Sequence, residues 1–355
     1  MATLERMIDG PAVWTGAELR QRGDWLGHLA PADVAEIEAA AQAATRRGVP
    51  LFEMTAADFP LPMLGERMSA IARVLEGGRG FAVLRGLPVA RYDIDTARRI
   101  IWGLATHLGM PEPQDGKGSL MHSVTDTGKE VEGNESNRGY ETDDELQFHN
   151  DGGDVFMLLC LRTAMSGGVS KLVSVGALFN EILRRRPELA AVLQEPFHFD
   201  ARSQNTLGIR VQSVPIFNYH AGHLSGLYKR RHITLAQRFP EVPRLTDLQV
   251  QALDLLDELC NDPEMHLSFS MEPGDIQIGN NYSILHSRTK YNDHPEPERK
   301  RHLLRVWLSL RDGRPLPEVF EKTREFGPTY ARRVRDGKVA ASAMSAPSAA
   351  STIGA

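Results

Sequence analysis

The segment FHND at residues 148–151 places an imidazole and a carboxylate two positions apart, at His149 and Asp151. If LQFHND forms a β-strand, Leu146 and Phe148 point towards a core, and the His and Asp point together to the other side. Neutral imidazole and carboxylate form a mixed nitrogen and oxygen ligand set that suits Fe(II). Taken alone, this pair is more often a polar strand edge or turn, so a third ligand is needed.

A second histidine completes a candidate set. The non-heme iron facial triad has two histidines and one carboxylate, and it leaves three coordination positions open. His286 in GNNYSILHSR follows a predicted strand and precedes RHLLRVWLSLR, a further strand that carries Arg305. A guanidinium group there can hold a carboxylate in bidentate fashion.

The elements that must position these residues change in type along the chain. Four helices are predicted, over residues 31–47, 60–76, 93–108 and 245–260. Short strands and turns dominate from residue 145 onward, apart from the 245–260 helix and two helices near 176–185 and 187–193. The polar stretch 111–142 is predicted to be either a functional loop or disordered. Because strands and helices do not alternate regularly, a doubly wound parallel sheet is disfavoured. The pattern predicts a mainly β, α+β fold with two sheets and helices packed outside.

Composition excludes several classes of function. The 355 residues carry a net charge of -5, which gives no basic footprint for nucleic acid and does not favour binding to an anionic membrane surface. No apolar run approaches the roughly 20 residues that span a bilayer, and the N-terminus lacks the features of a secretory signal. Only two cysteines are present, Cys160 and Cys260, so we expect no disulfide framework and a cytoplasmic location.

Several motifs, in order, resemble the taurine/2-oxoglutarate dioxygenase-like (TauD/TfdA) family of Fe(II)-dependent oxygenases. They are GFAVLRGLP at 80–88, ELQFHND at 145–151, SGGVS at 166–170, LHSR at 285–288 and RHLLRVWLSL at 301–310. Any one of these motifs is weakly specific, whereas the ordered set, which spans about 80 to 311, is a strong signal.

The resemblance implies a fold and a domain plan. The core would be a double-stranded β-helix, a jelly roll with helices outside. We expect this catalytic domain over residues 76–335, with an N-terminal helical segment, 1–75, packed on it. The Ala- and Ser-rich tail, 338–355, is predicted to be disordered.

The resemblance also implies roles for site residues. His149, Asp151 and His286 would ligate Fe(II), while Arg305 would bind the far carboxylate of the co-substrate 2-oxoglutarate. The Ser170 hydroxyl would assist, in place of the family's usual Thr. The last open position on the metal would take O2.

Two further features of the sequence bear on these roles. The loop HPEPERK before the last strand makes Arg301 a competitor for the role of Arg305, which we prefer from strand parity. Because Asp151 is present, hydroxylation or another oxidation is favoured over halogenation, since related halogenases lack this carboxylate. Glu145, Arg202 and Arg288 are candidate substrate contacts, each with an ordinary structural alternative.

The sequence therefore predicts an Fe(II)/2-oxoglutarate-dependent dioxygenase that hydroxylates a small polar molecule and releases succinate and CO2. The main alternative is a non-catalytic jelly roll that binds metal and 2-oxoglutarate as a sensor or scaffold. A zinc hydrolase on the same fold is a third hypothesis. The expected partners are a small-molecule substrate and, as an option, further copies of the chain in a homo-oligomer.

Overall fold

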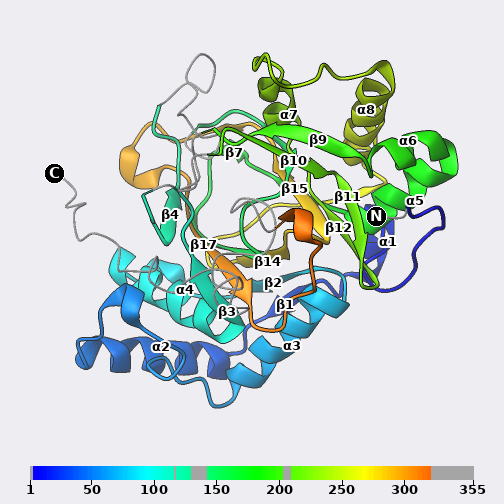
Figure 1. The fold of residues 1–355 in the computed structure, drawn as a ribbon. Coiled ribbons are helices and arrows are strands. Elements are labelled where there is room, and N and C mark those ends of the chain that lie inside the picture. Colours follow the sequence, from blue (N-terminus) through cyan, green and yellow to red (C-terminus); the bar gives the residue numbers. More distant parts are fainter. Residues whose placement is uncertain (1–2, 116, 129–141, 203–208, 321–355) are drawn as a thin grey trace.

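Two β-sheets pack face to face, and helices cover the outer side of each (Figure 1). This computed structural model describes residues 3–115, 117–128, 142–202 and 209–320. The larger sheet contains, in spatial order, β1 (Leu26–His28), β2 (Phe81–Arg85), β14 (Ile276–Asn280), β6 (Val155–Arg162), β17 (His302–Leu310) and β3 (Gly109–Glu112), while β4 (Met121–Val124) also pairs with β17. The smaller sheet contains β13 (His266–Phe269), β8 (Ser170–Ser174), β15 (Ile284–Arg288) and β5 (Leu146–His149). The predicted double-stranded β-helix is confirmed.

The space between the two sheets holds one of three hydrophobic clusters. Phe81 from β2 and Phe156 from β6 meet Leu172 from β8 and Ile284 from β15, and all four are fully or almost fully buried. Strands present alternate residues to one face, so the residues between these positions point away from this inner core. In β17, for example, Leu303 faces inward, whereas Leu304 and Val306 belong to the cluster that packs against helices.

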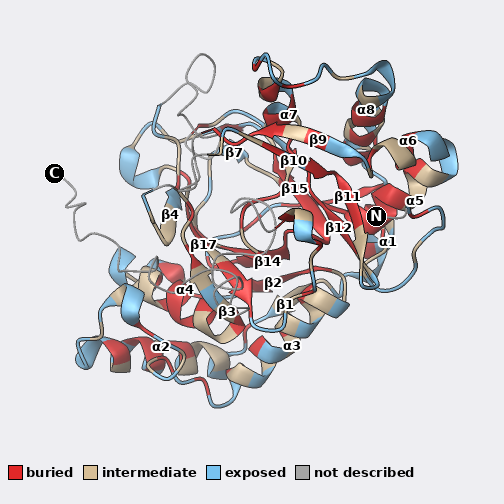
Figure 2. Cartoon of the chain, viewed as in Figure 1, coloured by how far each residue is buried: buried red, intermediate tan, exposed pale blue. Residues whose placement is uncertain are grey.

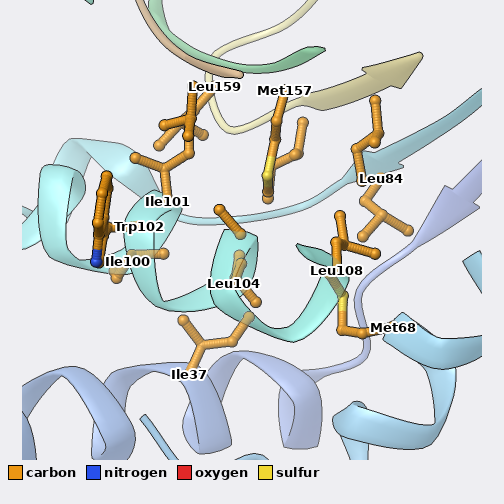
Figure 3. Packing of buried hydrophobic residues seen from close by; sticks show 14 of the residues in the cluster. Ile37, Met68, Leu84, Ile100, Ile101, Trp102, Leu104, Leu108, Met157 and Leu159 are labelled. Atoms are coloured by element: carbon orange, nitrogen blue, oxygen red, sulfur yellow. The ribbon is translucent and has the colours of Figure 1, made fainter. Parts of the chain in front are cut away.

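The outer face of the larger sheet is covered by α2 (Pro31–Arg46), α3 (Leu64–Gly77) and α4 (Ile94–Leu108). Figure 3 shows Leu104 of α4 between Ile37 of α2 and the sheet residues Met157 and Leu159. Each such buried side chain contributes about 1.5–3 kcal/mol. Asp93 caps α4 by accepting a hydrogen bond from the Thr96 N–H at 2.7 Å, which agrees with the predicted helix start.

The outer face of the smaller sheet is covered by α5 (Val175–Arg185), α6 (Pro187–Val192) and α8 (Asp247–Asn261). Thr246 caps α8 in a reciprocal capping box with Gln249.

The remaining elements are the hairpin of β9 (Pro196–Asp200) and β10 (Val211–Pro215), the hairpin of β11 (Phe217–His220) and β12 (His223–Gly226), the short α7 (Arg230–Ala236), and the pair β7 (Ser166–Gly167) and β16 (Tyr291–Asn292). Figure 2 shows buried strands at the centre and exposed helix surfaces around them.

Three features differ from the sequence prediction or lie beyond it. The stretch 111–142 contains the strand β4 and the end of β3, because both add to the edge of β17. The N-terminal segment contains α1 (Gly16–Arg22) and β1, which pairs in parallel with β2, so it is not purely helical. The domain boundaries stay predictions, and the tail 338–355 lies outside the described residues.

Candidate metal centre

The two predicted histidine ligands lie on neighbouring antiparallel strands. His149 at the end of β5 and His286 in β15 are direct register partners, and their ring centroids are 4.3 Å apart. Both side chains project to the side of the smaller sheet that faces the inner core, where the ring of Phe156 lies 4.3 Å from that of His286. The sheet pairing therefore brings together two imidazoles that are far apart in the sequence.

Asp151 completes the cluster. Its Oδ1 lies 3.9 Å from His149 Nε2, and its Oδ2 lies 3.8 Å from His286 Nε2. One ligand atom from each of the three residues lies within 4.8 Å of the others. Ligand atoms about 2.1 Å from a shared ion lie about 3 Å apart at right angles, so a small inward shift suffices. The three residues thus fit a facial His-Asp-His metal site.

The protonation state of His149 suits a ligand. Its Nδ1 lies 2.8 Å from the Gln147 carbonyl oxygen and must donate to it, so the lone pair is left on Nε2. Burial lowers the pKa of His149, although Asp151 acts in the opposite direction. Burial and the adjacent His149 also lower the pKa of His286 well below its usual range. Both imidazoles are therefore neutral at pH 7 and free of the proton that would block a metal.

Two asparagines that the sequence analysis missed hold the ligand turn in place. Asn150 is fully buried; its side-chain amide donates to the Ile284 carbonyl at 3.1 Å and its oxygen accepts from the Tyr228 N–H at 2.6 Å. Asn281 accepts from the Asp151 N–H at 3.0 Å. The sequence does mark both asparagines. Asn150 lies between His149 and Asp151, and Asn280–Asn281 interrupts an apolar strand pattern.

Arg305 lies against both carboxylate oxygens of Asp151. Its Nη1 is 3.1 Å from both carboxylate oxygens, and its Nε donates to Gln114 Oε1 at 2.8 Å. Burial opposes the charge of Asp151, but Arg305, His286, His149 and Lys229 together more than offset it, so the pKa of Asp151 lies below its usual range. Asp151 is consequently an ionised carboxylate in a buried site.

A second cationic cluster lies beside the Gly-Gly turn. The guanidinium groups of Arg288 and Arg301 lie 4.6 Å and 5.1 Å from the centroid of the Tyr291 ring. Among the described residues, Arg301 Nη1 and Arg288 Nε and Nη1 are buried without hydrogen-bond partners. Burial and the charge of Arg301 lower the pKa of Arg288 to about 10. Buried, unpaired guanidinium donors are expensive, and an anion would satisfy them.

The Gly-Gly turn and Ser170 border this cationic cluster. Gly168 has φ +68°, and a Cβ at this position would lie 3.3 Å from Arg301 Nε. Buried Ser170 begins β8 and is the register partner of Arg288. The turn therefore lets the backbone approach Arg301 closely, next to a serine hydroxyl.

Arg305 was preferred over Arg301 because side chains alternate along a regular strand, but β17 contains a register shift near its start. The pairing of β17 with β6 shifts register between His302 and Leu303, so side-chain alternation does not continue through the shift to Arg301. From Leu303 onward the predicted alternation is found. Arg301 consequently lies by the Gly-Gly turn, and Arg305 lies by Asp151.

The three candidate substrate residues differ in their surroundings. Glu145 is exposed just before β5. Arg202 is buried with φ +47°, and its N–H donates to Asp200 Oδ1 at 2.7 Å. Arg288 belongs to the cationic cluster and donates to the Thr142 carbonyl at 3.1 Å. The geometry brings Arg288 beside other predicted site residues, Arg301 and Ser170.

Comparisons with known proteins agree with this geometry. Residues 45–307 match the sequence model of the taurine catabolism dioxygenase TauD, TfdA family. FR-33289 synthase of Streptomyces rubellomurinus is 31% identical over 88% of this chain and 94% of its own length. The taurine hydroxylase-like protein SAT17 of Stachybotrys chartarum is 31% identical over 84% of this chain and 79% of its own length.

Solved structures share the fold. An asparagine oxygenase in complex with Fe(II), hydroxyasparagine and succinate matches with a TM-score of 0.64 and 19% identity, over 81% of this chain and 93% of that chain. The non-heme iron oxygenase OrfP in complex with Fe and α-ketoglutaric acid matches with a TM-score of 0.60 and 16% identity, over 80% and 93%. Among the described residues no helix is long and apolar enough to span a membrane. The chain belongs to the TauD/TfdA family and is an Fe(II)- and 2-oxoglutarate-dependent dioxygenase.

Proposed function

We propose that His149, Asp151 and His286 are the three protein ligands of the iron. The observation that carries this proposal is the convergence of their ligand atoms within 4.8 Å, from two neighbouring strands and the turn after β5, with both imidazoles neutral and the carboxylate ionised. Three protein ligands leave three positions, two for the keto-acid end of 2-oxoglutarate and one for O2. When bound, the iron and 2-oxoglutarate supply the oxidising power for attack on a substrate C–H bond, with succinate and CO2 as co-products.

We further propose that Arg301, together with Arg288 and the Ser170 hydroxyl, binds the far carboxylate of 2-oxoglutarate. This changes our initial preference for Arg305. Arg301 and Arg288 bring buried donors that lack protein partners among the described residues, whereas Arg305 contacts Asp151 and Gln114. Charge-assisted, bidentate contacts are the strongest way for a protein to hold a carboxylate.

The substrate is proposed to be a small polar molecule, an amino acid derivative or another carboxylate, and the reaction to be hydroxylation. The polar segment before β5, which contains Glu145, and the segment around Arg202 are the proposed substrate contacts. Similar proteins support this class, since one is an asparagine oxygenase and OrfP was solved in complex with hydroxy-arginine. The non-catalytic alternative is not favoured, because the relatives are enzymes.

One spectroscopic and one chemical measurement test the proposed iron site and reaction. Anaerobic addition of Fe(II) and 2-oxoglutarate to the purified protein should give a visible charge-transfer band. A screen of amino acids and other small carboxylates, with succinate as the readout, should then identify a substrate. Absence of both the band and succinate would reject the proposed site.

Location and assembly are also proposals. The two cysteines are buried and unpaired, which fits a reducing cytoplasm. A homo-oligomer stays a prediction, which size-exclusion chromatography with light scattering would test.

A further inference from the structure

One nitrogen of Arg305 bridges both oxygens of the metal-binding carboxylate. Nη1 is 3.1 Å from Asp151 Oδ1 and 3.1 Å from Oδ2, and both side chains are buried. The same two oxygens face the Nε2 atoms of His149 and His286 at 3.9 Å and 3.8 Å. Both oxygens of Asp151 therefore face a guanidinium nitrogen as well as the imidazole nitrogens of the two histidines.

Arg305 is held in this orientation by two neighbours. Gln114 contacts it twice, since Oε1 accepts from Arg305 Nε at 2.8 Å and Nε2 donates to the Arg305 carbonyl at 2.7 Å. The indole of Trp307 lies beneath the guanidinium, at 4.8 Å from its central carbon to the ring centroid. Gly152 makes room for that indole, because a Cβ there would lie 2.6 Å from Trp307 Cζ3. Gly152, which follows Asp151 in the sequence, therefore leaves room for the Trp307 indole that contacts Arg305.

We propose that Arg305, oriented by Gln114, is a positioning residue that retains one oxygen of Asp151, so that the carboxylate binds the metal through its other oxygen alone. This inference rests on the proposed ligand set. A carboxylate that binds through both oxygens occupies two coordination positions and leaves only two of six open. Chelation by 2-oxoglutarate and binding of O2 together require three.

The charge of Arg305 gives this role a second consequence. A guanidinium so close to the carboxylate competes with the metal for its negative charge. Loss of Arg305 frees both oxygens for the metal, so 2-oxoglutarate must displace one of them to chelate. Groups that orient metal ligands in this way typically change affinity or activity about 10- to 100-fold.

The experiment uses cobalt as a spectroscopic probe in the whole protein under anaerobic conditions. Wild type, Arg305→Met, Gln114→Leu and Gln114→Glu are titrated with Co(II), and their visible bands are recorded before and after 2-oxoglutarate is added. The control is Arg299→Met, which removes an arginine whose side chain is 59% exposed. Circular dichroism checks folding, and if Arg305→Met does not fold, the two Gln114 variants decide.

We expect the Co(II) bands of Arg305→Met and Gln114→Leu to differ from wild type before 2-oxoglutarate is present, and affinity for 2-oxoglutarate to fall about 10-fold or more. Gln114→Glu keeps an acceptor for Arg305 Nε and should retain the wild-type bands. Unchanged Co(II) bands in Arg305→Met and Gln114→Leu overturn the inference, even where 2-oxoglutarate binds weakly, because Arg305 would then act on the co-substrate alone. Failure of the wild type itself to bind Co(II) and 2-oxoglutarate instead rejects the proposed function.

Discussion

His149 and His286 are register partners across β5 and β15, with ring centroids 4.3 Å apart. Side chains directly opposite one another in an antiparallel pair are held about 5 Å apart by the backbone ladder. A shift of register by one residue would turn one ring to the opposite face of the sheet. The proposed metal site therefore depends on strand pairing in the smaller sheet, and Asp151 joins the two histidines from the turn that follows β5.

The first prediction concerns that turn. Asp151→Ala should abolish succinate formation and weaken Fe(II) binding, because it removes the only anionic ligand of the triad. It also removes the charge-assisted contact to Arg305, which should lower the free energy of unfolding of the metal-free protein by about 1–3 kcal/mol. Succinate assays, metal titration and urea unfolding measure the three effects. If the variant lost only metal affinity and turned over normally at high iron, Asp151 would not be needed for the reaction.

The second prediction concerns the co-substrate. Arg301→Ala should raise the KM for 2-oxoglutarate about 100-fold with a smaller change in kcat, since it removes a buried partner of a carboxylate. Arg288→Ala should act in the same direction. The control is Arg299→Ala, two residues before Arg301, where the side chain is 59% exposed and pairs with Glu296 at 3.5 Å. Equal effects of Arg299→Ala and Arg301→Ala would contradict a specific role for Arg301.

The part of the candidate site that lies on β5 could be predicted from the sequence, because strand periodicity and residue type act locally. Phe148 is buried and His149 lies on the other face, as the alternation of LQFHND predicts. The helices bounded by strong caps, such as α4 after Asp93 and α8 after Thr246, begin where the sequence places them.

The edge strands, the position of Arg301 and the contact between Gln114 and Arg305 could not be predicted, because they depend on contacts between distant segments. The edge strands β3 and β4 exist because they add to β17, and nothing in their composition marks them as strands. The register shift at His302 moves Arg301 out of the strand's alternation, which parity alone cannot reveal. Gln114 reaches Arg305 across 191 positions of sequence.

The third prediction tests the close packing behind Asp151. Gly152→Ala should displace the Trp307 ring, since the added Cβ would lie 2.6 Å from Cζ3, and the stacking on Arg305 would be disturbed. We expect a loss of about 1–3 kcal/mol in unfolding free energy from overpacking, together with lower activity. The control is Gly77→Ala at the end of α3, where nothing lies within 4 Å of the added Cβ. Urea unfolding and tryptophan fluorescence, to which Trp307 contributes as one of four tryptophans, report on both variants. A neutral Gly152→Ala would show that the ring has room to move.

The fourth prediction separates the oxygenase from a zinc hydrolase. Removal of metal with a chelator should abolish succinate formation, Fe(II) should restore it, and Zn(II) should not, because zinc has no redox chemistry. Zn(II) should instead inhibit, since the two imidazoles and the carboxylate suit it as ligands. A hydrolytic activity that Zn(II) restores and Fe(II) does not would favour the hydrolase.

The fifth prediction uses a histidine outside the metal site. Arg162 Nη2 lies 3.4 Å from His302 Nδ1, and His302 Nε2 lies 3.0 Å from Ser123 Oγ. Because arginine can only donate, Nδ1 accepts and Nε2 donates to the serine, which fixes the neutral imidazole. Burial and the charge of Arg162 lower the pKa of His302 to about 4.

The lowered pKa of His302 makes the folded protein less stable at acidic pH. Between pH 6.5 and about 4 the unfolded chain binds a proton at position 302 and the folded protein does not, so the fold loses stability as pH falls through this range. His302→Gln keeps one acceptor and one donor but does not titrate. The decrease in unfolding free energy from pH 7.5 to pH 5 should therefore be smaller in the variant by about 1 kcal/mol, after discounting for solvent screening at this half-buried position. Urea midpoints at both pH values measure it. His28→Gln on β1, where the side chain is exposed, should leave the pH dependence as in wild type, and an equal effect of the two substitutions would contradict the assignment to His302.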